Sequence, residues 1–162
     1  AMLAEQVANF AASAAEKLRA QHSACIEMMV FAYTNRFKEN EPQTYGSVLV
    51  SFPEATNDHR AIIAAAVNAT REVYKRGFGY KKAGILLGDF EQRGTQQQAL
   101  FDAPADPRHE RLMEVLDRVN RHYGHGALKT AAEGEKPFQM NREHVSRRYT
   151  TEWSELLTVK AK

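Results

Sequence analysis

Residues 25–34 of the chain read CIEMMVFAYT. β-branched, aromatic and methionine side chains fill this stretch, and such residues fit a pleated, half-buried surface. Glu27 is the one charged residue in it, so both faces of the predicted strand are largely apolar. We therefore expect a strand here, and the elements around it decide which fold it enters.

A helix is predicted before this strand. Apolar residues recur there at steps of three and four, which places them on one side of a helix that ends near Arg19. This stripe consists of Leu3, Val7, Phe10, Ala14 and Leu18.

A second helical pattern covers Asp58 to Arg76. Its apolar stripe consists of Ile62, Ile63, Ala66, Val67, Thr70, Val73 and Tyr74. Thr56, Asn57 or Asp58 can cap the start of this helix, and Gly77 suits its end.

Two further strands are predicted, after a polar connection that covers Asn35 to Gly46. Ser47–Phe52 alternates, so Val48, Val50 and Phe52 should face inward. In Lys82–Leu87 the inward side chains should be Ala83, Ile85 and Leu87.

The order helix, strand, strand, helix, strand predicts an α+β fold. We expect a small antiparallel sheet of three strands, covered on one face by two helices, within residues 1–92. Residues 93–107 form a linker, and residues 108–162 form a C-terminal extension. The extension should hold one amphipathic helix starting near Pro107 and an irregular remainder beyond Gly124. The apolar residues of that helix are Leu112, Val115, Leu116, Val119 and Tyr123.

The linker carries an unusual peptide. Residues 94–102 read GTQQQALFD, a stretch that begins with Gly94 and is followed by Pro104 and Pro107. Leu100 and Phe101 suit docking into an apolar pocket on another protein, with the Gln97 amide at its polar rim. The alternative is that both side chains fold back on their own domain.

Composition narrows the class of protein. An apolar fraction of 43% and a charged fraction of 26% indicate a folded core, and a net charge of +2 neither requires nor excludes nucleic-acid binding. The single cysteine, Cys25, excludes an internal disulfide and is expected to be a buried thiol and not a nucleophile. The sequence shows no signal peptide, and no apolar run reaches the roughly 20 residues of a membrane span. We expect a cytoplasmic protein.

Catalytic and metal sites are not indicated. His122 and His125 have a ligand-like spacing, but Gly124 ends the helix between them and no acidic or cysteine partner follows at ligand spacing. No pair of carboxylates stands on a predicted strand, and Asp89 stands alone at a strand end. We therefore expect neither a metal site nor catalysis.

Residues 74–82 read YKRGFGYKK and combine cations with aromatics. Glycines let the backbone approach a phosphate and cations neutralise it, so this segment can bind nucleic acid. An ordinary helix-to-strand turn with solvated lysines explains the segment as well.

Several ordered motifs resemble one family. The motifs are AAEKLR at 14–19, YKKAGILLGDF at 80–90, the peptide at 97–101, LMEVLD at 112–117, QMNRE at 139–143, SRRYTT at 146–151 and LLTVK at 156–160. They resemble the C-terminal part of the UmuC/MucB/ImpB/SamB family of Y-family translesion DNA polymerases, over essentially the whole chain.

The resemblance implies a role in SOS mutagenesis and DNA repair. Residues 1–92 would be the little-finger domain, which grips template-primer DNA. The implied DNA contacts are Lys81, Lys82, Arg36, Lys38, Lys75 and Arg76. The linker peptide would bind the sliding clamp through Gln97, Gln98, Ala99, Leu100 and Phe101.

The resemblance also places catalysis elsewhere. The palm and its Mg²⁺ ions would lie upstream, so this chain would be no enzyme and would hold no cofactor. A UmuD′-like subunit and RecA are implied partners of the tail, at a cluster of Arg142, Arg147, Arg148, Tyr149 and Trp153, and the setting would be the bacterial nucleoid. The alternatives are a solvated basic loop for the cluster and, for the chain, a protein-interaction module that never touches DNA.

A complete little finger resembles a four-stranded sheet, whereas this chain opens at Met2, already in the first helix. The first strand would then be missing, and Lys82–Leu87 would present an open edge. Such an edge recruits other strands, so we expect a homodimer through it.

Overall fold

The computed structural model describes residues 2–92, 107–134, 147–148 and 152–156 of the chain. Its helices and strands are α1 (Met2–Ala20), β1 (Ser23–Thr34), β2 (Tyr45–Thr56), α2 (His59–Val73), β3 (Tyr80–Gln92) and α3 (Pro107–Tyr123). Two short 3-10 helices follow, η1 (Ala131–Glu133) and η2 (Trp153–Glu155).

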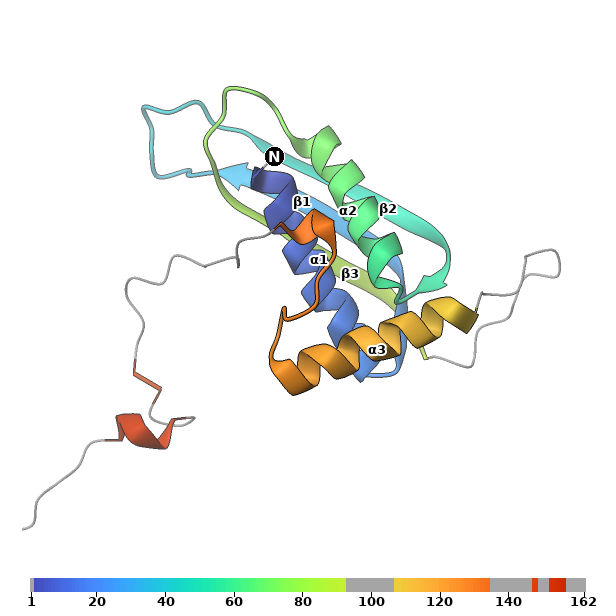
Figure 1. Ribbon diagram of the computed structural model, residues 1–162. Helices are drawn as coiled ribbons and strands as arrows, with labels where there is room; N and C mark the ends of the chain where they lie inside the picture. The colour runs from blue at the N-terminus through green and yellow to red at the C-terminus, as the bar shows by residue number, and fades with distance from the viewer. Residues whose placement is uncertain (1, 93–106, 135–146, 149–151, 157–162) are drawn as a thin grey trace, which may run out of the picture.

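The predicted α+β fold is confirmed. The strands form a 3-stranded antiparallel sheet in the order β2-β1-β3, so the strand at residues 25–34 is its centre. Helices α1 and α2 lie side by side over one face of this sheet (Figure 1). Both edge strands, β2 and β3, are longer than the sequence predicted. β2 continues through Pro53 to Thr56, which an edge strand tolerates because its outer N–H groups need no partner in the sheet.

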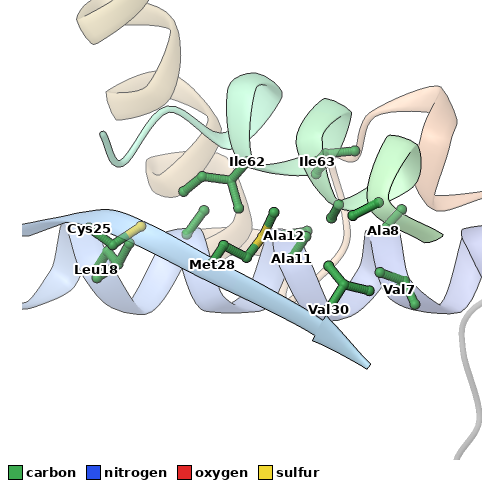
Figure 2. Packing of buried hydrophobic residues seen from close by; sticks show 13 residues of the cluster. Val7, Ala8, Ala11, Ala12, Leu18, Cys25, Met28, Val30, Ile62 and Ile63 are labelled. Atoms are coloured by element: carbon green, nitrogen blue, oxygen red, sulfur yellow. The ribbon is translucent and has the colours of Figure 1, made fainter. Parts of the chain in front are cut away.

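The core lies between the sheet and the two helices. Met28 and Val30 project from β1 toward Ile62 of α2, and α1 passes behind them (Figure 2). The predicted inward residues of β2 and β3 all pack against this cluster, which confirms the alternation read from the sequence. They are Val48, Val50, Phe52, Ala83, Ile85 and Leu87.

The helices meet through small residues. On α1 the buried residues are Val7, Ala8, Ala11, Ala12, Ala15 and Leu18, and α2 adds Ala66 and Ala69. The predicted stripe on α1 was therefore partly wrong, because only Val7 and Leu18 of it are buried, whereas Leu3, Phe10 and Ala14 are half-buried. Alanines let the two helix backbones approach closely, and they make up most of the buried face of α1.

Helix α2 starts as predicted and ends earlier. The Asp58 carboxylate caps its start and accepts a hydrogen bond from the Arg60 N–H at 2.8 Å. The helix ends at Val73 and not at the predicted Arg76, and Gly77 lies in the following loop with φ of 92°. Lys75 and Arg76 consequently belong to a loop.

Helix α3 is confirmed, and a charged pair fixes it against α1. The Arg19 guanidinium donates to both carboxylate oxygens of Asp117, with Nε–Oδ2 at 2.7 Å and Nη2–Oδ1 at 2.6 Å. The same guanidinium donates from Nη1 to the Asn57 carbonyl at 3.0 Å. The side chains are only 8% and 18% exposed, so this fork joins α1, α3 and the β2–α2 connection in a largely buried position.

The segment around η1 makes a second polar contact with the helices. His59 Nε2 lies 3.2 Å from Glu133 Oε1, and both side chains are buried. Burial favours a higher pKa for Glu133, but hydrogen bonds from His59 and Thr130 outweigh it and hold the pKa of that carboxyl below its usual value. The Glu133 carbonyl also accepts a hydrogen bond from Asn9 of α1 at 2.8 Å. Residues 107–134 are thus tied to both covering helices.

We predict that Asp117→Ala strongly destabilises the chain. The substitution leaves the buried Arg19 charge without its carboxylate, and breaking such a pair costs about 3–5 kcal/mol. Urea unfolding measures this loss. The matched control is Glu114→Ala on the same helix, an exposed carboxylate, which should leave the unfolding midpoint almost unchanged. Equal effects from both variants would contradict a special role for the fork.

We also predict self-association through β3. Within the described part of the chain, β3 pairs with β1 alone, so its other edge has no strand beside it. Leu86→Lys places a charge on this strand and should weaken association in sedimentation measurements at high concentration. Leu49→Lys is the control, because Leu49 sits across the same row on β2 and is similarly exposed, at 60% against 55%. If both variants act alike, the sheet faces associate and the edge does not. A wild-type monomer at high concentration would contradict the prediction.

Candidate nucleic-acid interface

Two loops at one end of the sheet bring the predicted DNA contacts together. The loop between β1 and β2 carries Arg36 and Lys38, and the loop between α2 and β3 carries Lys75 and Arg76. The two loops lie beside each other at the end of the sheet opposite to α3 (Figure 1). Lys81 and Lys82, the remaining predicted contacts, are at the start of β3. The segments are distant in sequence, so the fold gathers the six cations at one end.

Lys81, at the start of β3, contacts the loop between β1 and β2. Its Nζ atom lies 3.5 Å from Asn35 Oδ1 and 5.9 Å from the centre of the Phe37 ring. A cation over an aromatic face is held by the ring quadrupole, so these contacts orient the lysine while leaving it exposed. Phe37 itself is 91% exposed. Sequence reasoning missed Phe37, although an aromatic between Arg36 and Lys38 in a polar loop was a signal for it.

The loop after α2 is braced by tyrosine. The Tyr80 hydroxyl accepts a hydrogen bond from the Lys75 N–H at 2.8 Å and donates to the Val73 carbonyl at 3.2 Å. The ring of Tyr74 lies beside that of Tyr80, with centroids 5.8 Å apart. These contacts hold the backbone that carries Lys75 and Arg76.

The loop after β1 is braced by its own polar side chains. The Gln43 amide donates to the carbonyls of Lys38 and Glu41, both at 2.9 Å. Lys38 Nζ lies 2.7 Å from Glu41 Oε1, with both side chains about half exposed. Exposed pairs of this kind are weak, so Lys38 can exchange Glu41 for another anion. Arg36, Lys75 and Arg76 are exposed.

The uncovered sheet face lies next to these loops. Opposite residues in neighbouring strands share a face, so Tyr45, Tyr33 and Lys82 form one outward row. In the next rows Phe31 stacks near Tyr33, with centroids 6.2 Å apart, and the ring covers Gly84. A Cβ atom at Gly84 would lie 2.8 Å from the Phe31 ring, so the ring position requires glycine there.

This outward face is poor in charge, as the sequence indicated for its central strand. Among the outward residues of β1, only Glu27 is charged, and the centre of the face holds Leu49, Met29 and Leu86 in one row. Leu49 and Leu86 are each more than half exposed. Any phosphate held against this face would need backbone N–H groups or the cations of the adjacent loops.

The predicted clamp-binding peptide and much of the predicted tail cluster are not among the described residues. The peptide Gln97, Gln98, Ala99, Leu100 and Phe101 lies outside the described residues, as do Arg142 and Tyr149 of the tail cluster. The Arg148 side chain donates to Glu155 Oε1 from Nε at 3.1 Å and from Nη2 at 2.9 Å, so that cation already has an anionic partner.

Cys25 behaves as a core residue. Burial raises the pKa of its thiol to about 11, although a backbone hydrogen bond acts in the opposite direction. The thiol is fully buried, so it cannot serve as a thiolate nucleophile at neutral pH.

The described residues contain no cluster of histidine, cysteine or carboxylate side chains suited to a metal ion. Among them, too, no helix has the length and apolar character needed to cross a membrane.

Comparison with known proteins places the chain in a family. Residues 1–100 match the impB/mucB/samB family C-terminal domain, and residues 110–159 match a domain of unknown function (DUF4113). The chain is similar to Protein UmuC of Salmonella typhimurium, with 43% identity over 96% of this chain and 37% of that protein. It is also similar to Protein ImpB of Salmonella typhimurium (39% identity; 94% and 36%) and to Protein MucB of Escherichia coli (35% identity; 92% and 35%).

The chain spans a little over a third of the length of these relatives. Its match to the family covers well over half of its own residues. The resemblance predicted from the sequence motifs is thus confirmed: the chain belongs to the impB/mucB/samB family and corresponds to the C-terminal region of its members.

Proposed function

We propose that this chain is the non-catalytic C-terminal part of a Y-family translesion DNA polymerase of the SOS response. In this role it grips template-primer DNA and tethers the polymerase to the sliding clamp. The observation that carries the DNA-binding part is the gathering of two basic loops beside an uncovered sheet face. Membership of the impB/mucB/samB family supports the polymerase context.

The arrangement suits sequence-independent binding. Cations on braced loops can neutralise phosphates without reading bases, and the low-charge sheet face offers few groups that would select a base sequence. Lys81 and Lys82 start the strand at the edge of this face, and Lys81 lies next to Asn35 and Phe37 of the loop between β1 and β2. A duplex laid along the sheet would therefore meet the loop cations at one end.

The clamp-binding part rests on the linker peptide. Gln97, Leu100 and Phe101 have the pattern of a peptide that fills an apolar pocket on another protein. Two weak attachments, one to DNA and one to the clamp, raise each other's occupancy through effective concentration. The catalytic carboxylates and their Mg²⁺ would belong to the preceding part of the polymerase.

A second candidate is a protein-interaction module that binds the clamp, a UmuD′-like subunit or RecA without touching DNA. The exposed row of Leu49, Met29 and Leu86 favours it, because apolar side chains gain more from a protein surface than from phosphates. Salt separates the two candidates. Phosphate binding weakens steeply as salt rises, whereas an apolar contact changes little.

We predict that Lys81→Glu with Lys82→Glu weakens binding to duplex DNA and flattens its salt dependence. The slope of log affinity against log salt should fall by about one for each phosphate that the variant no longer neutralises. Fluorescence titration of the chain with duplex DNA at several salt concentrations measures both quantities. The matched control is Lys17→Glu with Arg121→Glu, which makes the same charge change on exposed helix positions away from the loops. An equal weakening in both variants would mean that net charge alone acts.

We predict that Leu100→Ala with Phe101→Ala abolishes tight clamp binding and leaves folding intact. Burial of each side chain is worth about 1.5–3 kcal/mol, so removing both should weaken affinity by roughly two orders of magnitude or more. Isothermal titration with purified clamp measures the affinity, and Thr95→Ala with Gln96→Ala is the neighbouring control. A large drop in melting temperature would instead show that the two side chains pack on their own domain.

A further inference from the structure

Helix α3 carries two apolar stripes, and the fold uses one of them. Met113, Leu116 and Asn120 are buried, at 5%, 6% and 8% exposure. The second stripe consists of Leu112, Val115, Val119 and Tyr123, at steps of three, four and four along the helix. Three of its residues are exposed, Leu112 at 46%, Val115 at 48% and Tyr123 at 74%, and Val119 between them is half-buried. We call this second stripe the outer seam. The sequence predicted one apolar face here, and the structure divides it.

The charges beside the outer seam are mostly positive. Arg111 and Arg118, each one position from a seam residue, are exposed and make no hydrogen bond or ion pair with another residue that the structure describes. The Asp117 carboxylate is occupied by Arg19, which leaves Glu114 as the exposed anion in the middle of the helix. The seam is therefore an apolar strip beside exposed arginines that pair with none of the described residues.

This combination defines an occupant. Apolar residues spaced by three and four positions interlock best with another helix, because the ridges of one helix fit the grooves of the other. Unpaired arginines complement carboxylates on the flanks of that helix. A second copy of the chain would bring its own arginines against these, and like charges across an interface are unfavourable. Phosphates of a duplex would face apolar side chains.

We propose that the outer seam of α3 binds an acidic amphipathic helix of a partner protein. This surface is separate from the candidate nucleic-acid interface, because α3 lies at the opposite end of the sheet from the two basic loops (Figure 1). The proposal holds whether or not the chain grips DNA. It assigns an interaction surface to the segment that matches a domain of unknown function.

The test uses a designed probe. A fluorescein-labelled synthetic peptide carries leucines at heptad a and d positions and glutamates at the flanking positions, and a second peptide replaces each glutamate with lysine. Anisotropy titration with the whole chain measures both affinities. The glutamate peptide should bind at least about tenfold more tightly than the lysine peptide, because the arginines beside the seam attract one and repel the other.

Two variants locate the binding surface. Leu112→Ser with Val115→Ser should weaken binding of the glutamate peptide at least about tenfold. Arg111→Glu with Arg118→Glu keeps the seam and should reverse the preference between the peptides, so it tests the proposal even if the serine variant folds poorly. Leu49→Ser with Leu86→Ser removes apolar side chains of the sheet that are at least as exposed as Leu112 and Val115, and it is the matched control, expected to bind like wild type.

Three results would overturn the proposal. The first is an equal weakening in the sheet control, which would mean non-specific apolar adhesion. The second is that the glutamate peptide fails to bind while the arginine variant loses affinity for duplex DNA, which would make α3 a nucleic-acid surface. The third is that the peptide fails to bind while the serine variant turns a dimer into a monomer in sedimentation, which would make a second copy the occupant.

Discussion

The two covering helices leave one face of the sheet open, and the rest of the structure follows from this constraint. Helices α1 and α2 approach closely through alanines, so together they form a cover for one face of three strands. Met28 and Val30 of the central strand point into that cover. The alternate residues of the same strands therefore have no covering layer among the described residues. Phe31, Tyr33 and their neighbours remain available for a partner.

The two ends of the layered domain differ in chemistry. At one end, short polar contacts brace two loops and hold their cations outward, with Lys81 placed between Asn35 and Phe37. At the other end, the same kinds of groups are turned inward. Arg19 is buried and needs the carboxylate of α3, and His59 is buried against Glu133. Cations that stay in solvent can serve binding, whereas the buried Arg19 cation and the contact between His59 and Glu133 hold the C-terminal segment in place.

Local sequence patterns predicted the elements but not their partners. Alternation located the three strands and their inward residues, and the caps located the start of α2. The buried face of α1 was predicted incorrectly because the prediction followed mainly the large apolar residues. Most of the residues that α1 buries are alanines, which let the two helices approach closely. The fork between Arg19 and Asp117 and the pair of His59 with Glu133 join residues far apart in sequence, and no local pattern reveals such contacts. Phe37 was missed because its partner, Lys81, lies on β3, far away in the sequence.

The exposed seam on α3 is a consequence of the buried charge on α1. Asp117 must face Arg19, and residues three and four positions away share its side of the helix, so Met113 and Asn120 turn inward with it. Val115 stands two positions from Asp117 and therefore points to another side. Hydrophobicity alone would have turned Leu112 and Val115 inward. A desolvated guanidinium without its carboxylate costs about 3–5 kcal/mol. Leu112 and Val115 are only about half exposed, so each loses only part of the roughly 1.5–3 kcal/mol that full burial would give, and the ion pair sets the rotation of the helix. An apolar surface kept outside by such a buried pair is stable in the free protein and ready for a partner.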